Sequence, residues 1–261
     1  MKTVIAVHTG TGNSLYIAKQ FKNAEIHFID EFLSGSYDLD DDTDRLGIVF
    51  PVYCWGLPYP VREFIREYLR QRDNSSLGYV FGIATCGAFP LYTLYDLSAS
   101  LADVGIALSY STSFKLPDAY LPLQKKAVSD EKAREAASLI KGDIERTVRD
   151  VENEEIRIPR RGPGWRIIRK FSSVGMKPRR NSTLSVSTKC TGCGLCSRIC
   201  PMGNIQIENG KASFSDKCIS CFACYHRCPE NAIDYKGATG QYKGLVATSE
   251  LFRPGRGIKE E

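Results

Sequence analysis

Short apolar runs alternate with amphipathic stretches through the first 150 residues of the chain. The runs have the length and the β-branched and aromatic content of buried strands. They occupy residues 3–7, 24–29, 46–50, 78–84 and 107–114. Helical spacing of apolar residues occurs at Ser14–Lys22, Pro60–Arg70, Leu91–Val104 and Ser129–Val151. The alternation predicts an α/β fold, a doubly wound five-stranded parallel sheet with helices on both faces.

The pattern changes after residue 150. Residues 156–180 contain three prolines, three glycines and nine arginines or lysines, and no acidic residue. This composition predicts a basic linker, residues 151–184, with one short amphipathic piece at Trp165–Phe171. We expect the linker to lie across an acidic neighbour. A docking patch for an acidic partner, a membrane-surface contact and nucleic-acid binding are the alternatives.

The composition is that of a globular protein. Together with the change of pattern after residue 150, it predicts two domains, residues 1–150 and 185–261. The chain has 261 residues, of which 43% are hydrophobic and 25% charged. No signal peptide and no membrane-spanning apolar run is recognised, so we expect a cytoplasmic protein. The net charge of +5 is uneven, with −4 in residues 1–150, +6 in 151–185 and +3 in 186–261. The basic excess therefore belongs to the linker and the end of the chain.

The ten cysteines are unevenly placed as well. Cys54 and Cys86 stand alone, whereas the other eight lie between residues 190 and 228. They form two copies of C-x2-C-x2-C-x3-C-P, CTGCGLCSRICP and CISCFACYHRCP, the second starting 28 residues after the first. Disulfides are rare in the cytoplasm, so this crowding indicates metal. The repeat indicates an internal duplication with one half-site in each copy.

The spacing favours an iron–sulfur cluster over zinc, because zinc sites use two pairs of ligands rather than two triplets with a trailing Cys-Pro. Residues 190–235 resemble the bacterial two-cluster [4Fe–4S] ferredoxins. The resemblance implies two clusters whose fourth ligands are exchanged between the repeats. One would be held by Cys190, Cys193, Cys196 and Cys228, and the other by Cys218, Cys221, Cys224 and Cys200. Between the repeats, IQIENGKASF predicts a β-hairpin around Asn209-Gly210.

The stretch HTGTGNS, residues 8–14, follows the first apolar run. It lacks the Gly-Lys-Ser/Thr of a Walker A loop, and Leu15 replaces the third glycine of a dinucleotide fingerprint. It resembles the phosphate loop of the flavodoxins, S/T-x-T-G-N-T, with Ser14 in place of the last threonine. The resemblance implies that an FMN phosphate binds Thr9, Gly10, Thr11, Gly12, Asn13 and Ser14. Hydroxyl and backbone N–H donors suit such a phosphate without lysine or metal.

Two further loops match the flavin loops of flavodoxins. The first, PVYCWGLP at 51–58, would place Val52, Tyr53, Trp55 and Gly56 near the isoalloxazine, and the second, TCGAFPLY at 85–92, would add Thr85 and Gly87, with Phe89 or Tyr92 at the border. One alternative is that the aromatic residues only cap the sheet edge. Another is that the domain is flavodoxin-like but has lost its flavin. Cys54 and Cys86 lie in these loops, where they are either a redox pair or, more commonly, small apolar side chains.

The whole chain resembles the flavodoxin–ferredoxin fusion proteins of anaerobic bacteria and archaea, the EFR-type ferredoxins. This resemblance implies electron transfer between FMN and two [4Fe–4S] clusters, with a redox partner protein as donor or acceptor. We expect an electron carrier rather than a substrate-specific enzyme, and we assign no catalytic residue. The alternatives are a flavin-dependent reductase of a quinone, nitro compound or corrinoid, and a redox sensor module. We expect no nucleic-acid binding and no membrane span, and a homodimer stays open.

Overall fold

The computed structural model describes residues 1–159, 177–179 and 183–255. The predicted amphipathic piece Trp165–Phe171 and most of the basic linker lie outside the described residues. The chain divides into two compact units. Unit 1 comprises Met1–Thr9, Ser14–Leu116 and Ala136–Lys177, and unit 2 comprises Gly10–Asn13, Pro117–Glu135 and Pro178–Glu261.

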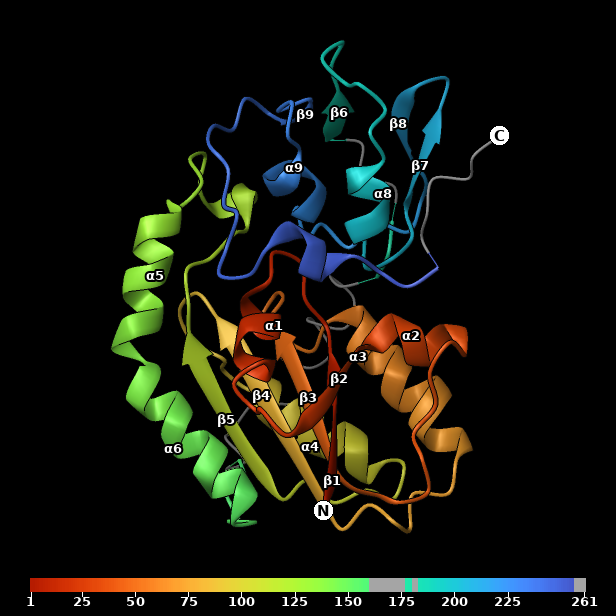
Figure 1. The fold of residues 1–261 in the computed structure, drawn as a ribbon, viewed down its shortest axis with the longest axis vertical. Coiled ribbons are helices and arrows are strands. Elements are labelled where there is room, and N and C mark those ends of the chain that lie inside the picture. The colour runs from red at the N-terminus through yellow and green to blue at the C-terminus, as the bar shows by residue number, and fades with distance from the viewer. Residues whose placement is uncertain (160–176, 180–182, 256–261) are drawn as a thin grey trace. The chain divides into compact units, whose positions relative to one another are not determined.

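Unit 1 is built on one five-stranded parallel sheet (Figure 1). Its strands are β1 (Lys2–Val7), β2 (Ala24–Phe28), β3 (Thr43–Pro51), β4 (Tyr79–Cys86) and β5 (Tyr110–Lys115). They lie in the order β2-β1-β3-β4-β5. This is the doubly wound order of the flavodoxin-like fold. The predicted fold class is therefore confirmed.

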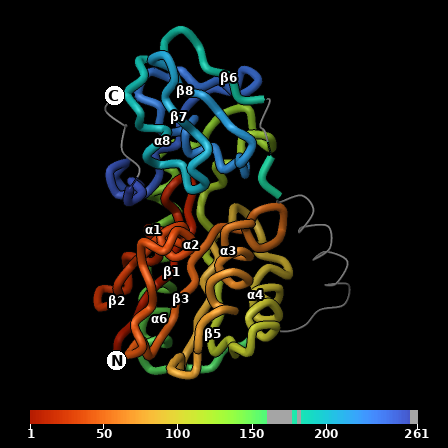
Figure 2. The backbone as a smooth tube through the Cα atoms, turned by 90° about the vertical axis from the view of Figure 1, so that its right-hand side faces the viewer, coloured from red at the N-terminus to blue at the C-terminus, as the bar shows by residue number. Residues whose placement is uncertain are grey.

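Helices cover both faces of the sheet. They are α1 (Asn13–Ala18), α2 (Ile29–Ser34), α3 (Tyr59–Glu63), α4 (Thr93–Ala102) and α6 (Lys141–Glu152). Helix α5 (Asp130–Leu139) precedes α6 in the chain and is divided between the two units. Side chains of α2, α3 and α4, such as Phe32, Val61 and Leu97, form one buried core with the strands. Helices α1 and α6 lie on the opposite face (Figure 2). Because helices cover both faces of the five-stranded sheet, only the ends of the strands stay open. The predicted loops lie at the carboxyl ends.

Three local predictions were incomplete. The helix expected at Ser129–Val151 is two helices, which are separated at Ile140, where ψ is 4° and where Gly142 follows closely. After α3 the chain continues as a π-helical turn, η1 (Phe64–Tyr68), and a 3₁₀ turn, η2 (Leu69–Gln71). Helix α2 was not predicted, since it has only six residues. It is stabilised by its ends: the Glu31 carboxylate accepts the Phe28 N–H at 2.6 Å, and Gly35 closes it with φ 72°.

In the described residues of unit 2, two small antiparallel sheets accompany two short helices. Its elements are η3 (Leu121–Leu123), β6 (Leu184–Val186), α8 (Leu195–Ile199), β7 (Ile205–Glu208), β8 (Lys211–Phe214), α9 (Ala223–Arg227), β9 (Ile233–Tyr235) and η4 (Thr248–Leu251). Strand β6 pairs with β9, and β7 with β8. The β7–β8 turn has positive φ at Asn209 (51°) and Gly210 (70°), as a two-residue hairpin requires. The expected hairpin is therefore present.

Residues 117–135 are part of the packing of unit 2, although they directly follow the last strand of the unit 1 sheet. The Thr239 N–H donates to Lys125 O at 2.8 Å, and the Ala127 N–H donates to Thr239 O at 2.9 Å. Nearby, the ring of Tyr120 meets that of Phe222 edge to face. The compact unit that holds the cysteine repeats therefore includes chain that lies far before them in sequence.

Candidate functional site

Two cavities in unit 2 are lined by cysteines. The first, which we call the Cys224 cavity, is lined by Cys200, Cys218, Cys221 and Cys224. The second, the Cys196 cavity, is lined by Cys190, Cys193, Cys196 and Cys228. Each takes three cysteines from one repeat and one from the other. The structure thus brings together the two sets of four that the ferredoxin resemblance implies.

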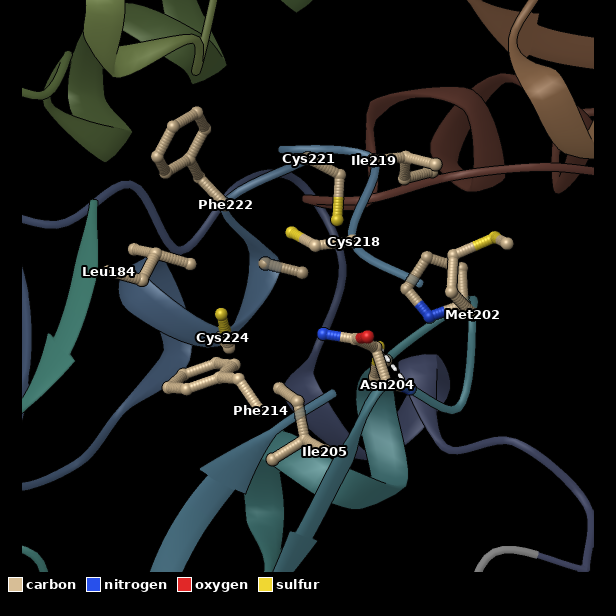
Figure 3. Close-up of a pocket in the computed structure, with 13 residues that line it drawn as sticks. Leu184, Met202, Asn204, Ile205, Phe214, Cys218, Ile219, Cys221, Phe222 and Cys224 are labelled. Atoms are coloured by element: carbon tan, nitrogen blue, oxygen red, sulfur yellow. Dashed lines mark hydrogen bonds between the residues drawn. The ribbon is translucent and has the colours of Figure 1, made fainter. Parts of the chain in front are cut away.

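The Cys224 cavity is lined mostly by apolar side chains, together with the buried Asn204. Figure 3 shows the side chains of Cys218, Cys221 and Cys224 directed into the same space, with the ring of Phe214 beside Cys224 and the ring of Phe222 turned away. Cys200 and Cys224 are buried. In the part of the chain that the structure describes, no three His, Cys, Asp or Glu side chains are grouped to hold a single metal ion.

More of the residues that line the Cys196 cavity are exposed to solvent. Its lining includes Thr191 and Glu230 together with Leu195 and Ile207. Cys193 is exposed, whereas Cys190, Cys196 and Cys228 are half-buried.

Burial makes three of these thiols poor acids. It raises the pKa of Cys196 and of Cys221 to about 12 and that of Cys224 well above its usual range, with neighbouring cysteines adding to each shift. Iron binds the thiolate rather than the thiol, so cluster binding would have to release these protons. The four-sulfur chemistry of each cavity fits a cubane cluster, whose iron supplies the charge that favours thiolate.

The duplication is visible in the backbone. Helices α8 and α9 begin and end 28 residues apart, as the repeats do. The fourth cysteine of each repeat accepts the N–H four residues later: Asn204 donates to Cys200 Sγ at 3.3 Å, and Ala232 donates to Cys228 Sγ at 3.2 Å. Such N–H···S bonds are among the features by which proteins set cluster potentials. In both repeats, therefore, the fourth cysteine accepts a hydrogen bond from the backbone N–H at the same position.

The predicted phosphate loop is divided between the two units. Gly10, Thr11, Gly12 and Asn13 are grouped with unit 2, while Thr9 and Ser14 belong to unit 1. All six except Asn13 are buried. In unit 1, the hydroxyl groups of Ser14 and Thr85 lie 2.9 Å apart and share a hydrogen bond. Two of the residues predicted to surround the flavin are therefore in direct contact.

The loop after β3 forms a tight turn. Tyr53 and Gly56 pair across it through N–H···O bonds in both directions, at 3.2 and 2.9 Å. Cys54 and Trp55 occupy its tip with positive φ, 45° and 59°. The side chain of Trp55 is 64% exposed. An exposed indole at a strand end is suited to stacking on a flat ring or to packing against a protein.

The loop after β4 lies next to this turn in the sheet. Val52 donates its N–H to Thr85 O at 2.8 Å, and Gly87 is half-buried. Phe89 is 72% exposed, which adds a second exposed aromatic side chain to the carboxyl-end loops. Cys86 is buried and its thiol points to Phe114 O at 3.8 Å, whereas Cys54 is exposed. The different settings of these two cysteines give no support to a redox pair.

Residues 189–233 match the model of a protein family described as a 4Fe-4S dicluster domain. This part of the chain is a ferredoxin domain. The match contains all eight clustered cysteines, so an iron–sulfur domain at the end of the chain is confirmed and the zinc alternative is wrong. No curated protein matches the chain significantly in sequence.

Several solved structures are similar to part of the chain at low identity. They include the Trp repressor binding protein from Bacillus subtilis, with a TM-score of 0.37, 15% identity and coverage of 44% of this chain and 84% of that chain. Rubredoxin oxygen:oxidoreductase from Desulfovibrio gigas has a TM-score of 0.35 and 10% identity, covering 57% of this chain and 36% of that one. An azoreductase from Bacillus anthracis str. Sterne has a TM-score of 0.35 and 11% identity, covering 57% and 99%. The fold assignment rests on the strand order.

Among the described residues, none of the helices has both the length and the apolar character needed to cross a bilayer.

Sequence analysis missed the residues of unit 2 that contact the loop Gly10–Asn13. The main ones are Arg227, Tyr242 and Val246. Their contacts span more than 200 residues of sequence, and no local pattern signals them.

Proposed function

We propose that the chain is an electron-transfer protein in which a ferredoxin domain with two [4Fe–4S] clusters is joined to a flavodoxin-like domain that binds FMN. The observation that carries the proposal is the pair of four-cysteine cavities, each with its fourth cysteine from the other repeat. The ferredoxin family match over residues 189–233 supports it. No residue is assigned a role in bond-making chemistry.

The proposed FMN site uses the predicted loop residues. Thr9, Thr11 and Ser14 would provide hydroxyl donors for the phosphate, and their burial fits a site that excludes water. Trp55 and Tyr53 would pack against the ring system. FMN supplies one- or two-electron redox chemistry when bound, and each cluster would carry one electron at a time. Holding both kinds of group in one chain gives a high effective concentration.

The test is anaerobic purification of the full chain, followed by iron, sulfide and flavin analysis and a redox titration. We expect about eight iron, eight sulfide and one FMN per chain. Cys221→Ala should lower the iron content by about half, whereas Cys54→Ala, an exposed cysteine outside both cavities, should leave it unchanged. Iron at or below one atom per chain in the unmodified protein would overturn the cluster proposal.

A ferredoxin with a flavin-free docking domain is the second candidate. It is favoured by the packing of Gly12, at which an added Cβ would lie 2.5 Å from Val246 Cγ2. Full iron content without flavin would support it. Turnover of a quinone or nitro compound without a protein partner would instead indicate a flavin-dependent reductase. Rapid re-oxidation only by a redox protein, with no such turnover, is the result expected of a carrier.

A further inference from the structure

The two cysteine cavities differ in which of their lining residues reach solvent. None of the 13 residues that line the Cys224 cavity, which Figure 3 draws, is exposed. The Cys196 cavity has exposed lining residues, namely Thr191, Cys193, Pro229 and Glu230. Electrons tunnel between two molecules fastest where the fewest atoms separate their redox groups. The Cys196 cavity is therefore the one that a molecule in solution can approach closely.

The exposed lining residues come from both repeats. Thr191 and Cys193 lie in the first repeat, and Pro229 and Glu230 directly follow Cys228, the last cysteine of the second. They border the same cavity, and all of them belong to unit 2. They form one surface, which we call the Cys193 face, and both repeats contribute to it.

The surroundings of the Cys193 face are mildly acidic. The exposed charged residues that line the Cys196 cavity, or that adjoin a lining residue in the sequence, are two lysines and three acidic residues: Lys189, Lys211, Glu208, Glu230 and Asp234. Two positive and three negative charges leave a net charge of −1. A cubane core with four thiolates would add about −2. Charge complementarity therefore favours a partner with a basic docking surface.

Two helices connect the cavities. Helix α8 carries Cys196 and is followed by Cys200, and helix α9 carries Cys224 and is followed by Cys228. In each case the two cysteines are about one helical turn apart and line different cavities. Redox groups held in the two cavities would thus be close neighbours. An electron from the Cys224 cavity can reach the Cys193 face by way of the Cys196 cavity.

We propose that the Cys193 face is the docking surface for an external one-electron redox protein whose own docking surface is basic. At this face one electron passes between the partner and the cluster of the Cys196 cavity, so that one is oxidised as the other is reduced and no bond is made or broken. Electrons of the Cys224 cavity leave by the same face. The inference rests on the cluster part of the proposed function and does not depend on FMN.

The test measures electron transfer to cytochrome c, a basic one-electron acceptor protein. Full-length, cluster-loaded protein is freed of flavin, reduced anaerobically with a stoichiometric amount of dithionite and mixed with the acceptor in a stopped-flow instrument. Thr191→Trp places an indole on the Cys193 face and should slow the transfer at least about fivefold. Thr239→Trp, the same substitution at an exposed position that lines neither cavity, is the matched control and should stay within about twofold of the unmodified rate.

A charge substitution tests the kind of partner. Glu230→Lys reverses one charge of the Cys193 face and should slow the transfer to cytochrome c about threefold at low ionic strength. The difference should shrink at high salt, because counter-ions screen exposed charges. An unchanged rate at low ionic strength would contradict a basic partner.

The outcomes separate this inference from the proposal on which it rests. If the unmodified protein holds at most about one iron atom per chain, the cluster proposal is wrong, and this inference is wrong with it. If the iron content is about eight but Thr191→Trp and Thr239→Trp transfer electrons equally fast, only the docking face is overturned.

Should Thr191→Trp lose iron, a pair of cysteine variants takes its place. Cys193→Ala leaves the four cysteines of the Cys224 cavity, and Cys221→Ala leaves those of the Cys196 cavity. At equal iron content, Cys193→Ala should transfer electrons at least about fivefold more slowly than Cys221→Ala. Equal rates, or a faster Cys193→Ala, would contradict the docking face.

Discussion

The two cysteine repeats have the same spacing but build unequal cavities. The Cys224 cavity is lined by Phe214 and Phe222 and contains two buried cysteines, whereas the Cys196 cavity has an exposed cysteine, Cys193, and the exposed Glu230 in its lining. Cysteine spacing therefore sets which sulfurs meet, and the residues between the cysteines set how each group of sulfurs is shielded. Because exposure and hydrogen bonding tune cluster potentials, the two proposed clusters are expected to differ in potential.

The backbone of the repeats shows how the difference arises. Gly192 and Gly194 of the first repeat have φ 68° and 71°, and Ser220 and Phe222, at the matching positions of the second, have φ 55° and 57°. The conformation is shared, but only the first repeat uses glycine for it. At Gly192 a Cβ would lie 2.6 Å from Gly210 O, so the hairpin turn leaves no room for a side chain. The second repeat instead accepts left-handed strain and places a phenyl ring in the core.

The largest expected effect comes from removing the clusters. We expect residues 183–255 to lose amide protection by at least about tenfold, because the core of unit 2 includes the cysteines themselves. Residues 10–13 and 117–135 should lose protection with them, while strands β1–β5 keep theirs. Hydrogen exchange with and without an iron chelator measures this. Protection that persists across 183–255 after full iron loss would contradict the view that the clusters stabilise this unit.

Exchanging the residue types at the matching left-handed positions tests the comparison of the repeats directly. Gly192→Ser should destabilise the unit by about 3 kcal/mol, since left-handed strain adds to a clash with backbone. Ser220→Gly should stabilise it by about 1 kcal/mol, because it relieves the same strain. The temperature at which the cluster absorbance is lost reports both. Equal effects of the two substitutions in the same direction would mean that the repeats are not distinguished by this backbone constraint.

A smaller effect on stability is expected from Asp118, which lies in the segment 117–135 that packs beside the Cys224 cavity. Burial raises the pKa of Asp118, although the Tyr120 N–H bonded to its carboxylate at 2.9 Å opposes the shift. A carboxyl group whose pKa is higher in the folded state stabilises the fold at acidic pH, and this contribution is lost as pH rises through the folded pKa. Asp118→Asn keeps the oxygen acceptor and removes the charge.

We therefore expect Asp118→Asn to raise the melting temperature at neutral pH by roughly 2 °C. The gain should vanish below about pH 3, where both states of the unmodified protein hold the proton. Melting curves over this pH range provide the measurement. A gain that stays constant with pH would assign the effect to packing rather than to the charge of Asp118.

Much of this architecture could be predicted from local patterns. The apolar runs located all five strands of the sheet, and Asn209-Gly210 located the hairpin, because periodicity and turn chemistry are local properties. The break at Ile140 was missed because the apolar spacing of Ser129–Val151 runs through it without interruption. Helix α2 was missed for the opposite reason, since six residues are too few for a periodic signal.

The candidate sites also differ in how far local sequence patterns could predict them. The cysteines could be grouped from their spacing and the ferredoxin resemblance, since the motif carries the ligands in a fixed order. The surroundings of the loop Gly10–Asn13 could not, because Arg227 and Tyr242 reach it only through the tertiary packing of unit 2. Neither residue belongs to a flavin motif, so a tertiary structure is needed to find them.

The exchange of the fourth cysteine between repeats is tested most directly by iron counts in paired variants. Cys200→Ser alone should retain about four iron atoms per chain, and adding Cys221→Ser should remove no more, because both cysteines line the Cys224 cavity. Adding Cys193→Ser to Cys200→Ser should instead remove both clusters. The opposite result, with about four iron atoms kept by the Cys200/Cys193 pair and none by the Cys200/Cys221 pair, would show that each repeat ligates its own cluster and would contradict the account.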